Sequence, residues 1–570
     1  MVFVFALVLL LARPAGAILT ILANGETMLP GSQLWLNRGD EVVLEVTGDG
    51  TTPDPLEGFL FVEGPGSISG CTLTYPGTAS EYNDLEEVAY VMEITVEETL
   101  AFFSASVERN LTDLSSWLLA DDRSVHDPLA GLLIGGIVFR CEGGGDVLLT
   151  LETDDEWTTY QDYTITIHQT AQTRTYYVDA NTGDDNNTGL SPDEAFETIQ
   201  KAVDSAYDGE TVIVRPGLYP GDINFLGKSI ILQSTDPNDF SIVQQTVLGS
   251  DSGAGQSPGD ELEAVITFRG DEDPACRLSG FNINGYIRGC DPLVDPDLEN
   301  HTHATISNCI LCNNAGDYGT VIMWCDGLIS NCILADNNNH PLSGVRPTIS
   351  QCYGTIKNCT LANNTAGVGI GICDGGTTEI TNCILYNDAV AVNTGGAARI
   401  SYSNIAEVIC EDPCQADLVW GPGNTNVDPC FVRVGDYSHA ILGDYHLKSQ
   451  AGRWDPQSSI WLVDAVSSRC IDAGSPSSPL GNEAKSPRNK RINMGAYGGT
   501  AQASKTPANW SLLPDLTNDG IVDQHDFAFQ AKDNCAPGGE KPGDLNRNGT
   551  VDMDDVATLI GVWLQTTIWH

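Results

Sequence analysis

The chain has 570 residues, and its 77 acidic and 27 basic side chains give a formal net charge of −50. Such an acidic chain excludes nucleic acid as an expected partner, because phosphate recognition needs clustered Lys and Arg. The length suffices for three or four domains, and no run of about 18 apolar residues predicts a transmembrane helix.

The N-terminus carries the pattern of a secretory signal. An apolar run over residues 2–11 is followed by Ala15, Gly16 and Ala17. The run is too short to span a membrane, and a small-residue A-x-A triplet is typical of a cleavage site. We therefore expect residues 1–17 to be a signal peptide, and the protein to be secreted, extracellular or associated with a cell surface.

Residues 18–170 contain short apolar or alternating runs, such as Val42–Val46 and Tyr163–Ile167, separated by Gly and Pro. This spacing predicts an N-terminal β-sandwich. Within it, residues 131–151 resemble the late strands of a cohesin-like sandwich. A carbohydrate-binding module, an immunoglobulin-like module and a passive spacer stay open as alternatives.

An internal repeat dominates the middle of the chain. A six-residue unit, Ile-x-Asn-Cys-x-Leu, places cysteines at 309, 332, 359 and 383, so the units recur at intervals of 23, 27 and 24 residues. A strand that short buries its apolar face only by stacking on the next copy. Residues 174–500 are therefore predicted to form a right-handed parallel β-helix, with columns of free cysteine thiols and of hydrogen-bonded Asn and Asp side chains.

The two ends of this region carry a family resemblance. Residues 176–233, which include an expected short helix over 196–206, resemble the opening of pectate-lyase-like β-helix proteins. Residues 470–498 resemble the closing motif of secreted bacterial β-helix proteins. The resemblance implies binding or degradation of an extended polysaccharide, with a lyase favoured over a hydrolase, and the β-helix could hold a further calcium ion.

No catalytic residue can be assigned from the sequence. A lyase needs a base such as Lys or Arg, together with calcium or Arg to hold the developing charge, whereas a hydrolase needs two carboxyl groups flanking the bond. His301 and His303 follow an acidic run and could form a substrate or metal rim, but a solvated loop is the simpler interpretation. The competing hypothesis is a non-catalytic surface or adhesion protein whose β-helix is a display rod.

After an expected linker at 501–512, residues 513–567 contain a calcium-loop pattern twice, at 515–526 and 544–555. Each copy has oxygen-bearing side chains at positions 1, 3, 5, 9 and 12 and glycine at position 6, and position 7 supplies a carbonyl, as a calcium ion requires. The expected calcium ligands are Asp515, Thr517, Asp519, Ile521, Asp523 and Asp526 in the first loop, and Asp544, Asn546, Asn548, Thr550, Asp552 and Asp555 in the second.

Both loops have aspartate at position 12 and are followed by helix-like residues, and this duplicated arrangement resembles a dockerin. The resemblance implies two calcium ions and a cohesin-type protein partner. By the family pattern, loop positions 10 and 11 contact that partner, here Gln524 and His525 in the first copy and Met553 and Asp554 in the second. Thr517 replaces the usual Asp or Asn and would weaken the first site. A calcium-stapled cap that binds no partner is the alternative.

Overall fold

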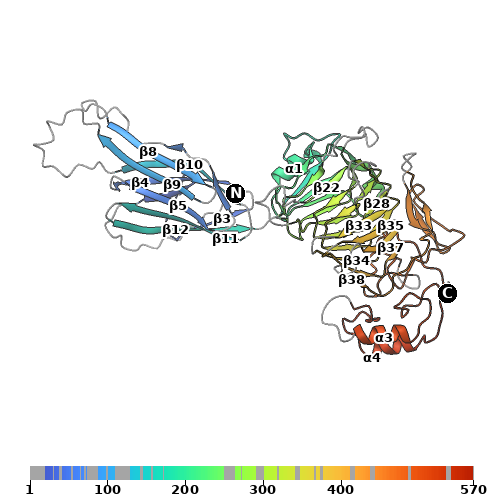
Figure 1. Cartoon of the computed structure of the whole chain (residues 1–570). Coiled ribbons are helices and arrows are strands. Elements are labelled where there is room, and N and C mark those ends of the chain that lie inside the picture. The colour runs from blue at the N-terminus through green and yellow to red at the C-terminus, as the bar shows by residue number, and fades with distance from the viewer. Residues whose placement is uncertain are drawn as a thin grey trace, which may run out of the picture. The chain divides into compact units, whose positions relative to one another are not determined.

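The computed structural model describes residues 19–568 in two compact units, Met1–Thr173 and Arg174–His570 (Figure 1). The expected signal peptide lies outside the described residues. Also outside the description are residues 30, 38–40, 53–55, 64–65, 70–71, 74–87, 98–99, 110–128, 142–144, 156–157, 171–172, 250–263, 271, 290–300, 317–319, 340–346, 365–366, 373–375, 394, 411–416, 437–442, 485–488 and 534–540.

The first unit consists of two six-stranded sheets. Burial alternates along the strands where side chains are described: Val42 and Leu44 are buried and Val43 is exposed, as expected for sheets with one apolar face. One sheet contains β1 (Leu19–Ala23), β2 (Glu26–Met28), β4 (Glu41–Thr52), β6 (Gly66–Ser69), β7 (Thr72–Leu73) and β10 (Leu129–Cys141). The other contains β3 (Gln33–Asn37), β5 (Leu56–Glu63), β8 (Val88–Glu97), β9 (Leu100–Arg109), β11 (Gly145–Asp155) and β12 (Thr158–Thr170).

The second unit is built on two long parallel sheets, of ten and fourteen strands. Along the chain, single strands of the ten-stranded sheet are followed by one or two strands of the fourteen-stranded sheet, so from β14 onward the backbone winds in a coil (Figure 1). The ten-stranded sheet contains β13 (Thr175–Val178), β14 (Thr211–Val214), β17 (Ile231–Ser234), β20 (Arg277–Ser279), β23 (Thr305–Ser307), β27 (Leu328–Ser330), β31 (Thr355–Lys357), β34 (Thr377–Thr381), β36 (Ala397–Ser401) and β38 (Asp417–Trp420).

The fourteen-stranded sheet closes the other side of the coil. It contains β15 (Gly217–Tyr219), β16 (Ile223–Asn224), β18 (Thr246–Gly249), β19 (Ala264–Thr267), β21 (Asn282–Asn284), β22 (Tyr286–Arg288), β24 (Ile310–Cys312), β26 (Ile322–Met323), β28 (Ile333–Ala335), β30 (Ile349–Ser350), β32 (Thr360–Ala362), β33 (Val368–Ile372), β35 (Ile384–Val392) and β37 (Asn404–Cys410). The chain is thus mostly β with long parallel sheets. A right-handed β-helix stays a prediction that this topology supports.

Short elements complete the second unit. The expected helix near 196–206 is α1, and Ile199, Ala202 and Val203 on its inner face are buried in the core. The remaining elements are η1 (Pro192–Glu194), α1 (Ile199–Ser205), α2 (Phe240–Gln245), β25 (Ala315–Gly316), β29 (Asn338–Asn339), β39 (Phe431–Arg433), β40 (Asp444–Leu447), β41 (Arg453–Asp455), β42 (Ile460–Leu462), α3 (Gln524–Asp533) and α4 (Met553–Ile560).

The interior of the coil contains both of the expected side-chain columns. The repeat cysteines are buried free thiols: Cys309, Cys332, Cys359 and Cys383. Beside them, Asn337 donates its amide N–H to Asn364 Oδ1 over 2.9 Å, and Asn364 donates to Asp388 Oδ2 over 2.8 Å. These bonds between successive turns satisfy polar groups that burial would otherwise leave unpaired.

Residues 501–512 pack against the coil end. Ala503 and Trp510 are buried, and the Ser504 hydroxyl donates to the Leu447 carbonyl. Ser511 donates to the buried carboxyl group of Asp472. This expected linker is therefore a packed segment, and the two predicted calcium loops follow it along the chain.

Candidate calcium-binding site

The two predicted calcium loops have the same backbone conformation. Gly520 and Gly549, at position 6, have φ of 95° and 93°, a left-handed conformation that a side chain would strain. Their N–H groups donate to the position 1 carboxylates, to Asp515 over 3.0 Å and to Asp544 over 2.7 Å. The loops therefore curl so that position 1 lies inside the turn.

The aspartate at position 12 is held in the same way in both loops. Asp526 accepts hydrogen bonds from the backbone N–H groups of positions 3 and 9, at 3.0 and 2.9 Å. Asp555 accepts the corresponding two bonds, also at 3.0 and 2.9 Å, and belongs to the capping box at the start of α4. Each carboxylate is thereby fixed at the mouth of its loop.

The first loop contains a buried carboxylate that is only partly satisfied. Asp515 is 1% exposed, and no described residue makes a hydrogen bond to its Oδ1. Burial raises the pKa of this carboxyl group to about 7; the nearby charge of Arg491 opposes the rise, and the charges of Asp526 and Asp519 add to it. A cation in the loop would supply the missing partner, so the donor set fits a hard divalent ion. Calcium at both loops stays a prediction.

The first loop is also anchored to the end of the coil. The fully buried Arg491 donates to the carbonyls of Ala473, Gly474 and Asp515, and its guanidinium lies 5.4 Å from the Tyr402 ring. At loop position 4, Asn518 donates to the carbonyls of Gly423 and Ala473. Since both residues link the loop backbone to the coil, the loop is built on a rigid support.

The second loop makes a lighter contact with the same surface. Arg547 is the residue at position 4 and matches Asn518, with φ of 58° against 55°. Its guanidinium donates to the Pro476 and Lys490 carbonyls at 3.0 and 3.2 Å. The exposed loop residues are Asn546, Arg547, Asn548, Gly549, Thr550, Asp552, Met553 and Asp554. The two loops therefore differ in burial although their internal bonds match.

The first loop is closed by a contact that no pattern in the sequence predicts. The C-terminal tail pairs with it: Leu564 N–H donates to the Val522 carbonyl over 2.8 Å, and Thr567 N–H donates to Gly520 over 2.8 Å. The segments that meet are far apart along the chain and carry no pairing signal in their composition. Only the position of the tail after α4 brings them together.

The four expected partner-contacting residues are all exposed, and they begin the two helices. Gln524 and His525 start α3, and Met553 and Asp554 start α4. The outer face of α4 and the turn after it is apolar, with Met553 75%, Ile560 57% and Leu564 68% exposed. On α3, the polar Gln524 stands at the position of Met553 and the small Ala531 at the position of Ile560. The two repeats therefore present different surfaces.

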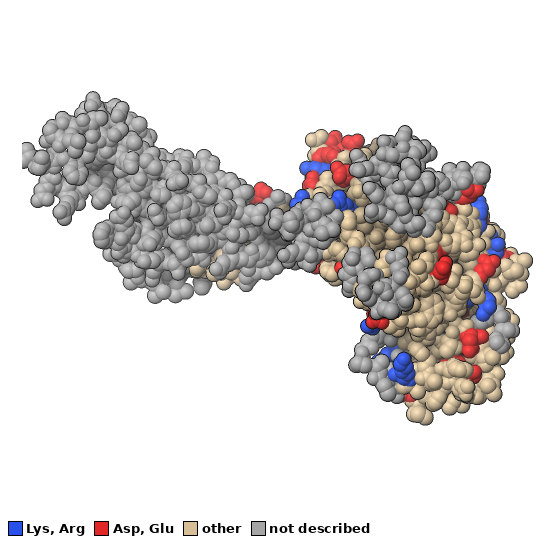
Figure 2. All heavy atoms as spheres, viewed as in Figure 1, with Lys and Arg blue, Asp and Glu red and all other residues tan. Residues whose placement is uncertain are grey.

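No catalytic centre emerges among the described residues of the coil. On the ten-stranded sheet, Glu379 and Arg399 are exposed and lie opposite each other on the neighbouring strands β34 and β36. Lys357 is half-buried on the next strand, β31, two residues after Thr355, the residue that pairs with Glu379. The face drawn in Figure 2 carries both acidic and basic side chains in a larger uncharged area. His301 is half-buried and makes a 3.0 Å contact with Asp326. His303 is exposed.

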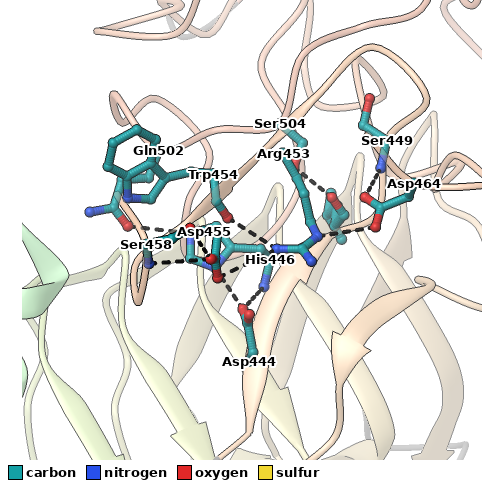
Figure 3. Close-up of polar contacts among 11 residues, drawn as sticks. Asp444, His446, Ser449, Arg453, Trp454, Asp455, Ser458, Asp464, Gln502 and Ser504 are labelled. Carbon is teal, nitrogen blue, oxygen red and sulfur yellow. Dashed lines mark hydrogen bonds and ion pairs between the residues drawn. The ribbon is translucent and has the colours of Figure 1, made fainter. Parts of the chain in front are cut away.

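The closing segment holds a denser polar network (Figure 3). His446 contacts Asp444 Oδ1 at 2.7 Å and Gln502 at 3.2 Å, and its ring stacks on Tyr497 with centroids 3.6 Å apart. Because His446 is 0% exposed, a substrate has no access to this imidazole. The network holds the closing segment together and is not an assigned catalytic site.

The comparisons with known proteins are partial. A family model described as "Disaggregatase related" matches residues 344–474, less than half of the chain. No curated protein matches. In addition, all helices among the described residues are too short or too polar to reach across a bilayer.

Similar solved structures cover about a quarter of the chain. One is a non-cellulosomal cohesin from the archaeon Archaeoglobus fulgidus, with 14% identity over 27% of this chain and 92% of that one, and a TM-score of 0.17. Another is a dockerin–cohesin complex, with 16% identity over 25% of this chain and 96% of that one, and a TM-score of 0.16. At these TM-scores the likeness carries no argument about function.

Proposed function

We propose that this chain is a secreted polysaccharide-binding or polysaccharide-degrading protein that attaches to a cohesin-type partner through a calcium-dependent, dockerin-like C-terminal module. The observation that carries the proposal is the matched geometry of the two loops, in which the carboxylates at positions 1 and 12 take the same backbone bonds. Two such loops, each followed by a helix, form a compact unit around Leu516, Val522, Leu545 and Leu559.

The partner-binding face is proposed to be the outer side of α4. This helix has one side buried through Asp555 and Leu559 and an apolar stripe on the other, formed by Met553, Ile560 and Leu564. A helix that is apolar on both sides needs a partner for its exposed side. The first repeat lacks this stripe, so we expect a single orientation of the partner.

The test is capture of the full chain by purified cohesin domains in calcium and in a chelator. We expect calcium-dependent binding that Met553→Asp and Ile560→Asp abolish. The matched variants Gln524→Ala and Ala531→Ser on α3 should change the affinity less than about threefold, since they remove little apolar area. If no cohesin in a broad panel binds, the partner is wrong even though the calcium sites would stand.

For the glycan, the proposed surface is the outer face of the ten-stranded sheet, where Lys357, Glu379 and Arg399 lie. A lyase would release unsaturated uronates from polygalacturonate or alginate, measured by their ultraviolet absorbance. Loss of this signal in Lys357→Ala or Arg399→Ala would assign the base or the charge-holding group. If the protein forms no product and is not retained on any acidic or neutral glycan, the non-catalytic display rod is the remaining hypothesis.

A further inference from the structure

One corner of the coil, which follows β22, β26 and β30, carries aromatic and ionisable side chains on three successive turns. Thr302 pairs there with Cys325 in a parallel bridge, and both side chains are buried. Because side chains alternate along an extended chain, the residues on either side of this pair point out of the coil. We call this half-buried group the His301 corner, and its members are Arg288, His301, Trp324, Asp326, Gln351 and Tyr353.

The imidazole of His301 is held in one orientation by the next two turns. Its Nδ1 lies 3.0 Å from Asp326 Oδ1, and the Tyr353 ring stacks on the imidazole with centroids 5.4 Å apart. Asp326 is fixed in turn, because its Oδ1 also accepts the Tyr353 N–H over 2.9 Å. A carboxylate only accepts, so the neutral imidazole donates from Nδ1 and leaves Nε2 as an acceptor. Among the described residues, nothing bonds to His301 Nε2.

Arg288 supplies a positive charge at the same corner. Its guanidinium lies 5.6 Å from the centre of the Trp324 ring, whose Nε1–H donates to Gln351 Oε1 over 3.0 Å. Within the described part of the chain no carboxylate forms an ion pair with Arg288, although 77 acidic residues stand against 27 basic ones. A guanidinium stacked on an aromatic ring keeps its N–H edge for an oxyanion, which it can bind through two parallel hydrogen bonds.

The backbone of this corner is strained. Trp324 and Gln351 have φ of 57° and 51°, in the left-handed region that glycine and asparagine adopt most readily. At another corner of the same coil, asparagines hold the left-handed positions, at Asn308, Asn331 and Asn358. Since asparagine makes such a turn with less strain, the turn itself does not account for an indole at the His301 corner. Residues held in this conformation concentrate at ligand-binding sites.

We propose that the His301 corner binds an acidic sugar unit of a glycan. Arg288 holds the carboxylate or sulfate group of that sugar, and His301 Nε2 accepts a hydrogen bond from one of its hydroxyl groups. The inference rests on the glycan-binding function proposed above and adds a second contact surface to it. Arg288 lies on the fourteen-stranded sheet, whereas the surface proposed above lies on the ten-stranded sheet.

The test is calorimetric titration of the full chain with oligogalacturonate, with sulfated dextran oligosaccharide and with unmodified dextran oligosaccharide. We expect binding of one or both acidic ligands, which identifies the acidic group, and no binding of the neutral one. Arg288→Gln should lower the affinity for the acidic ligand about tenfold or more, as loss of a hydrogen bond to a charged group does. Its Tm without ligand should match that of the wild type, because Arg288 makes no hydrogen bond to a described residue.

The matched control is Lys532→Gln, because Lys532 is exposed on α3 and its loss changes the net charge by the same amount. This variant should bind the acidic ligand as the wild type does. Equal affinity in the wild type and in Arg288→Gln would overturn the inference and leave the proposed glycan-binding function standing. Equal binding of acidic and neutral ligands would do the same. If the wild type binds none of the three ligands, the inference is also wrong, and retention on the wider glycan panel then decides the proposed function separately.

Discussion

One carboxyl group is buried in the coil and another in the first loop. Burying a charged carboxylate costs free energy, and the two sites accommodate this cost in different ways. Asp388 ends the ladder of Asn314, Asn337 and Asn364, and burial raises its pKa to about 7. Burial also raises the pKa of Asp515 to about 7, but this group lies with other carboxylates in a loop. The protonated, uncharged form suits Asp388, because its hydrogen-bonding neighbour in the ladder is an amide. A cation suits Asp515, because Asp519 and Asp526 lie near it and the single positive charge of Arg491 does not balance them.

The comparison shows that a raised pKa by itself does not identify a functional site. The Asn residues of the ladder donate to carbonyls and to one another. Asp388 Oδ1 and Asp515 Oδ1 both lack a hydrogen-bond partner among the described residues. The two groups differ in their surroundings, because the first loop brings further carboxylates near Asp515 and is tied to Arg491 outside it. Four experiments would sharpen or break this contrast.

The largest effect is expected for Arg491→Ala. Loss of the fully buried guanidinium leaves the Ala473, Gly474 and Asp515 carbonyls without these donors, and we expect a loss of about 3–5 kcal/mol in the unfolding free energy of the second unit. Arg547→Ala, the matched change at the second loop, should cost less than about 1 kcal/mol. Thermal unfolding followed by circular dichroism measures both. Equal losses would mean that the loops are anchored alike.

Removal of one calcium site at a time is expected to have the next largest effect. Asp526→Ala and Asp555→Ala each delete the position 12 carboxylate, and calcium titration should then find one site instead of two. At a calcium concentration of about 100 Kd, each lost site should lower stability by about 2.7 kcal/mol relative to the wild type. Asp388→Asn should keep the full calcium-dependent stabilisation. A stoichiometry that neither loop variant changes would contradict the assignment of the loops.

A smaller effect is expected from pH at the coil. The folded pKa of Asp388 lies above its ordinary value of 3.8, so its contribution to stability is complete below about pH 4 and is lost as pH rises through about 7. In Asp388→Asn the amide should donate to the Leu361 carbonyl, as earlier ladder members do to theirs, and we expect a gain on the order of 1–3 kcal/mol at pH 8. Denaturant unfolding at pH 5 and pH 8 measures the difference in unfolding free energy between Asp388→Asn and the wild type. This difference should be smaller at pH 5 than at pH 8.

The smallest effect on stability is expected at the outer face of α4. Met553→Ser and Ile560→Ser change exposed side chains, so the unfolding free energy should stay within about 0.5 kcal/mol of the wild type. Partner affinity, measured by calorimetry against a bound cohesin, should nevertheless fall. A fall in stability as large as that of the buried-residue variants would show that this face is covered by the chain itself.

Much of the fold was predictable because the repeat is local. Each Ile-x-Asn-Cys-x-Leu unit fixes one strand and one turn, and its spacing fixes the stacking, which is why the parallel sheets and the cysteine and asparagine columns were anticipated. The sequence indicates a helix after each loop but not the length of α3, since the apolar pattern of α3 is weak and its length depends on packing against the second repeat. Packing of Trp510 within the expected linker could not be predicted, because burial of a single aromatic side chain depends on residues that are distant in the chain.

By itself, the sequence determined the mostly β character, the winding of the repeat region and the positions of the carboxylates in both loops, since all of these follow from periodicity and from residue type at fixed spacing. Only the tertiary structure decided that the first loop lies against the coil end and that the C-terminal tail closes it. These contacts join segments far apart along the chain, where no local pattern records the pairing.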